Sequence, residues 1–167
     1  MNKRAVLLVV DVQRGFIMPD TKHVPAAIKR HIMATHDQYE ITIATKFTNP
    51  PGSLFETRLK WIKMRDPVDT ALCDEVASFV NVIIRKTGYG SLTPQVIDIL
   101  ESLKIETVDV CGVDTDQCVL ATLFELWDMG FAPRLLVPQS GSTGGPEAHA
   151  AGILSARRAI GIKNVVG

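Results

Sequence analysis

The stretch Thr107–Met129, TVDVCGVDTDQCVLATLFELWDM, combines a strand pattern, a polar turn and a helix pattern. Its first part, Thr107–Val113, is mostly β-branched or aliphatic without strict alternation, which is typical of a strand covered on both faces. A helical pattern then runs from Thr115, the expected N-cap, to Met129, and Gly130 follows as a C-cap would. A buried strand that leads directly into a helix indicates an α/β fold with a parallel sheet.

The rest of the chain repeats this alternation. Five more short apolar runs predict strands at Ala5–Val10, Ile41–Thr45, Val80–Ile84, Pro133–Val137 and Lys163–Val166. Helical patterns lie between them at Pro25–Gln38, Pro94–Leu103 and Pro146–Ile160, and Thr93 is placed to cap the second of these. Thr48–Asp74 is the least regular stretch. We therefore expect a single domain over residues 1–167, folded as a three-layer α/β/α sandwich.

Composition excludes several classes of protein. The 167 residues carry 18 basic and 18 acidic side chains, which argues against a nucleic-acid binder acting through a basic surface. No apolar run approaches the ~20 residues needed to span a bilayer, and the first run is too short for a secretory signal. The three cysteines form no CxxC pair, so neither a disulfide framework nor a zinc site is expected. The sequence predicts a soluble cytoplasmic protein that binds a small molecule and needs no metal or other cofactor.

Ligands of such sheets bind beyond the carboxyl ends of the strands, so the residues that follow each apolar run are the candidates for chemistry. Asp11 follows the first strand, Lys86 the third, and Cys118 lies just after the fourth, in the first turn of a helix. That position favours a thiolate, which is the nucleophilic form. Each residue alone has a structural alternative: a loop carboxylate, a solvated lysine and a small buried thiol. Together they form an acid, a cation and a thiol that can meet in one cleft.

At these residues the chain resembles the isochorismatase-like cysteine hydrolases. The matching segments are Leu7–Gln13 with Phe16, Arg85–Ser91, Val110–Val119, Gly144–Glu147 with His149, and Arg157–Gly161. The resemblance implies a six-stranded parallel sheet and a catalytic triad of Asp11, Lys86 and Cys118. It also implies a cis peptide between Val113 and Asp114, an oxyanion hole made by the amides of Asp114 and Cys118, and a homodimer or larger homo-oligomer.

Departures from the family pattern narrow the expected chemistry. Nicotinamidases of the family carry an Asp-x-His…His metal cluster after the second strand, whereas Thr45–Ser53 contains no histidine here. A metal-dependent nicotinamidase is therefore disfavoured. Cys118 favours hydrolysis of the C–N bond of a small amide or carbamoyl compound through an acyl-enzyme. Two alternatives stay open: a vinyl ether hydrolase of the isochorismatase type, and a thiol sensor or interaction protein on the same scaffold.

Four aromatic residues are candidates for the substrate pocket because each lies close after a strand end or in a loop that faces the cleft. These are Phe16, Phe47, Phe55 and Tyr89. Trp61 and Trp127 lie on helical patterns, for which packing in the core or at an interface is the expected role.

Overall fold

The structure, a computed structural model, describes residues 5–167 and contains an all-parallel sheet of six strands in the order β3-β2-β1-β4-β5-β6. The strands are β1 (Ala5–Val10), β2 (Tyr39–Phe47), β3 (Val82–Lys86), β4 (Thr107–Val113), β5 (Ala132–Gly141) and β6 (Val165–Val166). This confirms the predicted α/β fold and its parallel sheet. Residues 1–4 of the expected domain lie outside the described residues.

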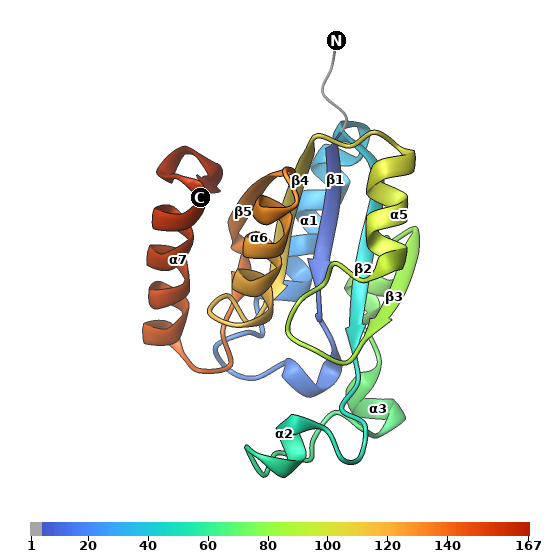
Figure 1. Ribbon diagram of the computed structural model, residues 1–167, viewed down its shortest axis with the longest axis vertical. Coiled ribbons are helices and arrows are strands. Elements are labelled where there is room, and N and C mark those ends of the chain that lie inside the picture. Colours follow the sequence, from blue (N-terminus) through green and yellow to red (C-terminus); the bar gives the residue numbers. More distant parts are fainter. Residues whose placement is uncertain (1–4) are drawn as a thin grey trace.

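Helices cover both faces of the sheet (Figure 1). One layer contains α5 (Pro94–Ser102), α6 (Cys118–Asp128) and α7 (Pro146–Ile160), and the other contains α1 (Val24–Thr35) and the short α4 (Asp74–Ala77). Two more short helices, α2 (Leu54–Thr57) and α3 (Pro67–Thr70), lie in the segment that looks irregular in the sequence. Single 3-10 turns occupy Arg14–Phe16, His36–Gln38 and Ile162–Asn164. None of the helices in the described part of the chain is long and apolar enough to cross a membrane.

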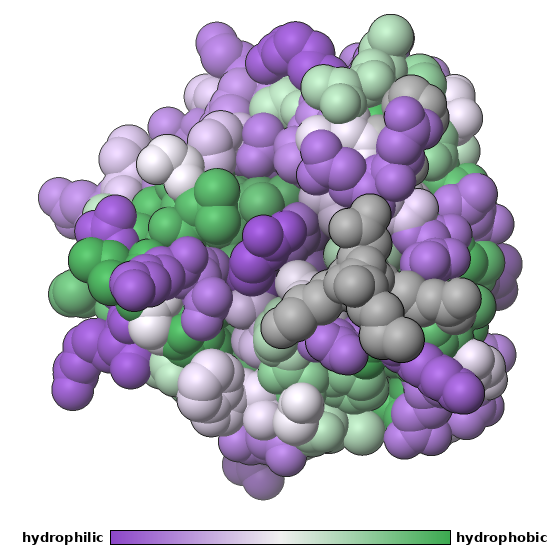
Figure 2. Space-filling model, turned by 90° about the horizontal axis from the view of Figure 1, so that it is seen from above, coloured by the Kyte–Doolittle hydropathy of each residue, from purple (hydrophilic) through white to green (hydrophobic). Residues whose placement is uncertain are grey.

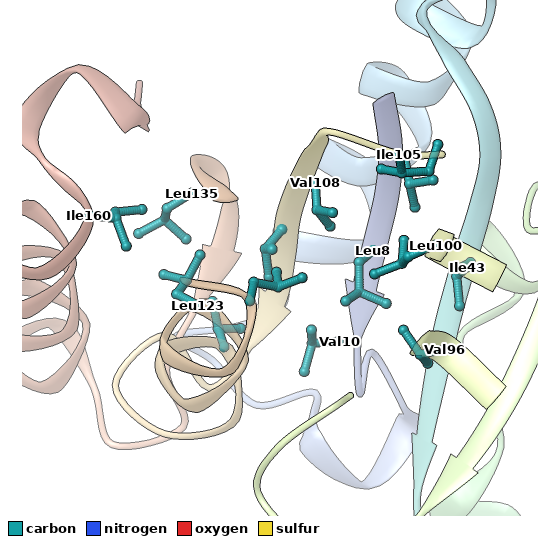
Figure 3. Packing of buried hydrophobic residues seen from close by; sticks show 14 of the residues in the cluster. Leu8, Val10, Ile43, Val96, Leu100, Ile105, Val108, Leu123, Leu135 and Ile160 are labelled. Carbon is teal, nitrogen blue, oxygen red and sulfur yellow. The ribbon is translucent and has the colours of Figure 1, made fainter. Parts of the chain in front are cut away.

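The core is divided between the two faces of the sheet. Leu8 and Val10 of β1 pack toward the α5–α7 layer with Leu100 and Leu123 (Figure 3), whereas the intervening Leu7 packs in the second cluster. All are essentially fully buried. Because successive side chains of a strand point to opposite faces, a strand covered on both sides must be apolar throughout. This explains the unbroken apolar runs of the sequence.

Several element boundaries differ from those predicted. β3 begins and ends two residues later than expected, so Lys86 is its last residue and does not follow it. α6 begins at Cys118, and Thr115 is not its N-cap; Gln117 holds that position without a side-chain hydrogen bond. The Thr115 hydroxyl is instead 2.8 Å from His149 Nδ1 on α7. The predicted cap of α5 is confirmed, because the side chain of Thr93 accepts a hydrogen bond from the Val96 amide.

The strand order defines where a ligand can enter. β1 and β4 are neighbours, and the chain leaves them toward opposite edges of the sheet, which opens a crevice at their carboxyl ends. This end is the lower one in Figure 1, with α2 and α3 beyond it. Figure 2 views the molecule from the other end, where hydrophilic side chains predominate and hydrophobic ones form separate patches. The site therefore has to be sought among the residues that follow β1 and β4.

Candidate active site

Asp11 occupies a strained and fully buried position directly after β1. Its φ of 53° lies in the left-handed region, which costs a residue other than glycine about 1–3 kcal/mol. The Thr45 hydroxyl of β2 stabilises this conformation by bonding to both the backbone and the side chain of Asp11. It accepts a hydrogen bond from the Asp11 amide at 3.2 Å and donates one to Asp11 Oδ1 at 2.7 Å. The other carboxylate oxygen is thereby left for a different partner.

That partner is Lys86, at the end of β3. Its Nζ lies 2.7 Å from Asp11 Oδ2, and the two side chains are only 2% and 0% exposed. The same ammonium group donates hydrogen bonds to Gly88 O at 3.1 Å and Tyr89 O at 2.7 Å. The two carbonyl oxygens thus take two of the three ammonium protons, and the ion pair with Asp11 balances the charge. Lys86 is therefore a buried, fully paired cation, and the alternative of a solvated lysine is wrong.

Oδ2 of Asp11 keeps the capacity to take a proton. Lys86 faces it as an ion pair, and no described residue donates an aligned hydrogen bond to it. The neighbouring cation favours the ionised carboxylate. An ionised carboxylate with a free lone pair is suited to act as a general base.

Cys118 is the first residue of α6 and is partly buried. Burial is the main cause that raises the pKa of its thiol, followed by the negative charge of Asp11, while the positive charge of Lys86 lowers it. The thiol is therefore protonated in the free protein near neutral pH. The helix N-terminus was expected to favour the thiolate, whereas burial and the charge of Asp11 favour the protonated thiol. A thiolate has to be produced by transferring the proton during the reaction.

Asp114 shapes the turn between β4 and α6. Its peptide bond with Val113 is cis. Its carboxylate accepts hydrogen bonds from the Thr143 amide at 2.7 Å and the Thr143 hydroxyl at 2.6 Å, while burial raises its pKa. Its carbonyl oxygen accepts from the Gln117 and Val119 amides. The amide of Cys118, at the start of the helix, has no partner within the helix. This amide and that of Asp114 stay the predicted donors to an oxyanion.

A cavity of about 350 Å³ opens above the thiol. The residues that line it are Phe16, Phe47, Phe55, Leu59, Trp61, Tyr89, Val113, Asp114, Gln117, Cys118 and Thr143. All four aromatic residues named from the sequence are among them. The expectation for Trp61 is wrong: it lies outside the helices, and its ring is stacked 6.3 Å from Phe16. In the sequence, its position inside the irregular segment Thr48–Asp74 indicates a loop residue that can form part of a pocket wall.

Gln13 is a positioning residue that the sequence reasoning did not single out. It is fully buried, and its Nε2 donates to Phe47 O at 2.8 Å and Thr70 O at 2.9 Å, while its Oε1 accepts from the Phe47 amide at 2.8 Å. A buried amide with all these bonds fixes the backbone around it. In the sequence, Gln13 could have been noticed as a polar residue that lies shortly after the apolar run Ala5–Val10.

Within residues 5–167, no group of three or more His, Cys, Asp or Glu side chains is arranged to hold a metal ion. The other two thiols lie in apolar surroundings. Cys111 in β4 is completely buried, and Cys73 precedes α4; burial raises the pKa of both, that of Cys73 to about 11. All three cysteines are free.

The sequence model of the isochorismatase domain matches residues 5–162. The chain belongs to the isochorismatase family. This confirms the resemblance, and it places the protein among the isochorismatase-like hydrolases. No functionally curated protein is significantly similar to it in sequence.

Solved structures share this isochorismatase fold. Pyrazinamidase/nicotinamidase from Streptococcus mutans superposes with a TM-score of 0.83 at 17% identity, covering 98% of this chain and 99% of that one. An isochorismatase-like hydrolase from Alkaliphilus metalliredigens gives 0.81 at 16% identity, with 93% and 92% covered. N-carbamoylsarcosine amidase from Thermoplasma acidophilum gives 0.77 at 18% identity, with 88% and 89% covered. At these identities the likeness shows the fold.

The cause of the raised thiol pKa is testable by alkylation. Asp11→Asn removes the charge that opposes ionisation of Cys118 and leaves that of Lys86, so the pKa of the thiol should fall. We expect the pH at which iodoacetamide labels Cys118 to decrease by about one unit or more, measured by mass spectrometry of the Cys118 peptide. Cys73 provides the internal control, because its pKa depends chiefly on burial elsewhere. An unchanged or higher labelling pH for Cys118 would contradict the proximity of the two groups.

Proposed function

We propose that the protein is a cysteine hydrolase that cleaves the C–N bond of a small amide or carbamoyl compound through a covalent acyl-enzyme. One observation carries the proposal: the buried carboxylate of Asp11 lies 2.7 Å from the Lys86 ammonium group, and Cys118 lies close enough to this pair for both charges to act on the pKa of its thiol. A nucleophile, a base and a cation that keeps the base ionised are the parts that covalent catalysis needs.

The proposed reaction has two halves. In the first, Asp11 takes the thiol proton while Cys118 Sγ bonds to the substrate carbonyl carbon, and the oxyanion is held by the amides of Asp114 and Cys118. The C–N bond then breaks as Asp11 returns the proton to nitrogen, so ammonia or an amine leaves and a thioester remains. In the second half Asp11 takes a proton from water, which attacks the thioester. The C–S bond breaks, the thiol is protonated again, and a carboxylic acid leaves.

The cavity favours an uncharged substrate. None of its lining residues is Lys or Arg, and its ionisable side chains are those of Tyr89, Asp114 and Cys118. Isochorismate is a dicarboxylate, so this lining counts against the vinyl ether alternative. The names of two structural neighbours, a nicotinamidase and a carbamoylsarcosine amidase, support amide or carbamoyl chemistry. The raised pKa of Cys118 counts against a thiol sensor, since sensing cysteines are low-pKa thiols.

A substrate screen tests the function. Purified protein is incubated with primary amides, carbamoyl compounds and isochorismate-like ethers while ammonia release and the mass of the Cys118 peptide are followed. We expect ammonia together with an acyl adduct on Cys118 for at least one uncharged amide or carbamoyl compound. Turnover of the ethers alone, without any adduct, would overturn the proposal in favour of acid-catalysed ether hydrolysis.

We further propose that the protein acts in the reducing cytoplasm, in keeping with three free thiols, on a small molecule and not on nucleic acid or a membrane. We propose a homodimer or larger homo-oligomer as its assembled state. Light scattering over a range of protein concentrations tests this assembly, and a monomer throughout would contradict it.

A further inference from the structure

A second hollow lies next to the catalytic cavity, between α2 and the segment that follows β3. Its volume is about 560 Å³, and it is lined by Pro50, Ser53, Leu54, Phe55, Arg58, Leu59, Thr87, Gly88 and Tyr89. Phe55, Leu59 and Tyr89 also line the catalytic cavity, so they form the boundary between the two. The rings of Phe55 and Tyr89 meet edge to face with their centroids 5.0 Å apart. The two hollows are therefore neighbours, and these side chains form the wall between them.

The second hollow presents apolar surface to solvent. Leu54, the first residue of α2, is 72% exposed, and Leu59, which follows the C-cap Arg58, is 62% exposed. Arg58 is the one charged residue among those that line this hollow. A contiguous apolar surface beside a catalytic cavity is typical of a binding site for an apolar group.

We propose that this second hollow binds the distal part of an uncharged, extended apolar acyl chain whose carbonyl is attacked by Cys118. The inference rests on the proposed function and deepens it by naming the substrate class. Between the two half-reactions the acyl group stays bonded to Cys118, which keeps its carbonyl end in the first cavity. The rest of a chain too long for that cavity then has to extend past Phe55 and Tyr89 into the second hollow. Arg58 disfavours a cationic chain end at the far side.

A series of straight-chain primary amides, from acetamide to octanamide, tests the proposal through ammonia release. We expect kcat/KM to rise by about two- to fourfold for each added methylene, because full burial of one methylene is worth about fourfold in binding. A flat or falling series with the short amides still hydrolysed overturns the chain-binding proposal and leaves the proposed function intact. If no amide is hydrolysed and Cys118 carries no adduct, both are overturned.

A pair of matched variants locates the effect. Leu54→Asp places a charge in the second hollow, and Val68→Asp places one on α3, at a residue 65% exposed and outside both hollows. The kcat/KM ratio of octanamide to acetamide should fall about tenfold or more in the first variant and stay unchanged in the second. Equal ratios in both variants overturn the proposal. A change of molecular mass by light scattering in Leu54→Asp, with the ratio unchanged, would identify the hollow as a subunit contact instead.

A different set of contacts leads to a second inference, about how Lys86 is held. The two carbonyls that accept from Lys86 belong to Gly88 and Tyr89. The next residues of this loop are bound to α6: Glu125 Oε2 accepts from the Ser91 amide at 2.8 Å and the Leu92 amide at 3.0 Å. The fit is close, because a Cβ at Gly90 would fall 1.7 Å from Glu125 Oε1.

Thr122 adds a further link from α6. Its hydroxyl contacts the Ser91 hydroxyl at 2.8 Å and the carbonyl of Cys118 at 2.7 Å. The helix that begins with the nucleophile is thus bound to the loop that holds the cation. We infer that Glu125 is a positioning residue: it fixes the Gly88–Tyr89 carbonyls and, through them, the distance from Lys86 to Asp11.

Glu125→Ala tests this role, which also rests on the proposed function. We expect kcat to fall about tenfold or more with KM little changed, since a displaced catalytic group lowers the rate without removing pocket contacts. The acid limb of the kcat profile should move to higher pH, because an Asp11 without its cation is protonated more readily. Glu125→Gln, which keeps an acceptor oxygen, should restore part of kcat. Asp128→Ala, at an exposed position of the same helix, is the control. An unchanged profile in Glu125→Ala would overturn the inference.

Discussion

Replacing Cys118 with alanine should abolish amide hydrolysis, with a loss of at least about 10³-fold in kcat, because Cys118 carries the one thiol among the residues that line the cavity. The acyl adduct should disappear at the same time. The measurements are ammonia release and intact mass after quenching during turnover. Removing one sulfur from a partly buried position should leave the fold in place, which circular dichroism checks.

Cys73→Ala is the matched control for this variant. It also removes a buried thiol, at a position that precedes α4 and does not line the cavity. We expect full activity from it. If Cys118→Ala retained turnover on a substrate that the unaltered protein cleaves, covalent catalysis by this residue would be excluded.

Replacing Lys86 with methionine should lower kcat by about 10²-fold or more. The variant keeps most of the apolar stem but leaves Asp11 buried without its cation, which favours the protonated carboxyl group. A protonated Asp11 cannot take the thiol proton, so turnover falls. Turnover within a few-fold of the unaltered protein would exclude the assignment of Lys86 to the triad.

The same variant should also lose stability. A lysine at a strand end is expected to contribute little when it is solvated. Because Lys86 is buried, however, its removal breaks a buried ion pair, for which the cost is about 3–5 kcal/mol. Urea denaturation measures this loss in the free energy of unfolding.

Two controls separate the loss of turnover from the loss of stability. Arg134→Met removes the partner of Asp109, another buried carboxylate, which Arg134 Nε contacts at 2.6 Å. It should destabilise the protein while leaving kcat close to normal, because this ion pair does not line the cavity. Lys46→Met, in β2 and outside the proposed triad, should change neither kcat nor the free energy of unfolding much. Equal losses of kcat in Arg134→Met and Lys86→Met would mean that instability, and not catalysis, explains both.

The sequence predicted the architecture well because the central strands β1 and β4 are covered on both faces and the longer helices each bury an apolar side. Ala5–Val10 and Thr107–Val113 were located to the residue for this reason. Boundaries shifted where local signals compete with tertiary contacts. Thr115 is a good N-cap by type, but its hydroxyl meets His149, a residue far along the chain. Single-residue propensities do not contain that contact.

The candidate site was predicted in part. Residues at strand ends were found because topology alone brings them to one edge. The electrostatics of the site were not predicted, because the pKa of Cys118 depends on how deeply the folded chain buries it and on its proximity to Asp11. Trp61 was missed because the residues around it resemble a helical pattern, whereas in the structure it lies outside the helices and packs beside Phe16.

The hydrogen bonds of Gln13 fix both ends of the segment that runs from the end of β2 to the end of α3. One side chain holds the chain at Phe47, where the segment leaves β2, and again at Thr70, where α3 ends, so the span between them is tied down at both borders. Its interior supplies Phe55, Leu59 and Trp61 to the cavity, while Asp11, Lys86 and Cys118 all come from outside it. One segment thus supplies part of the cavity wall, and the three residues of the proposed triad lie outside it. We expect that a different loop between these two borders would change the cavity wall and leave the proposed triad in place.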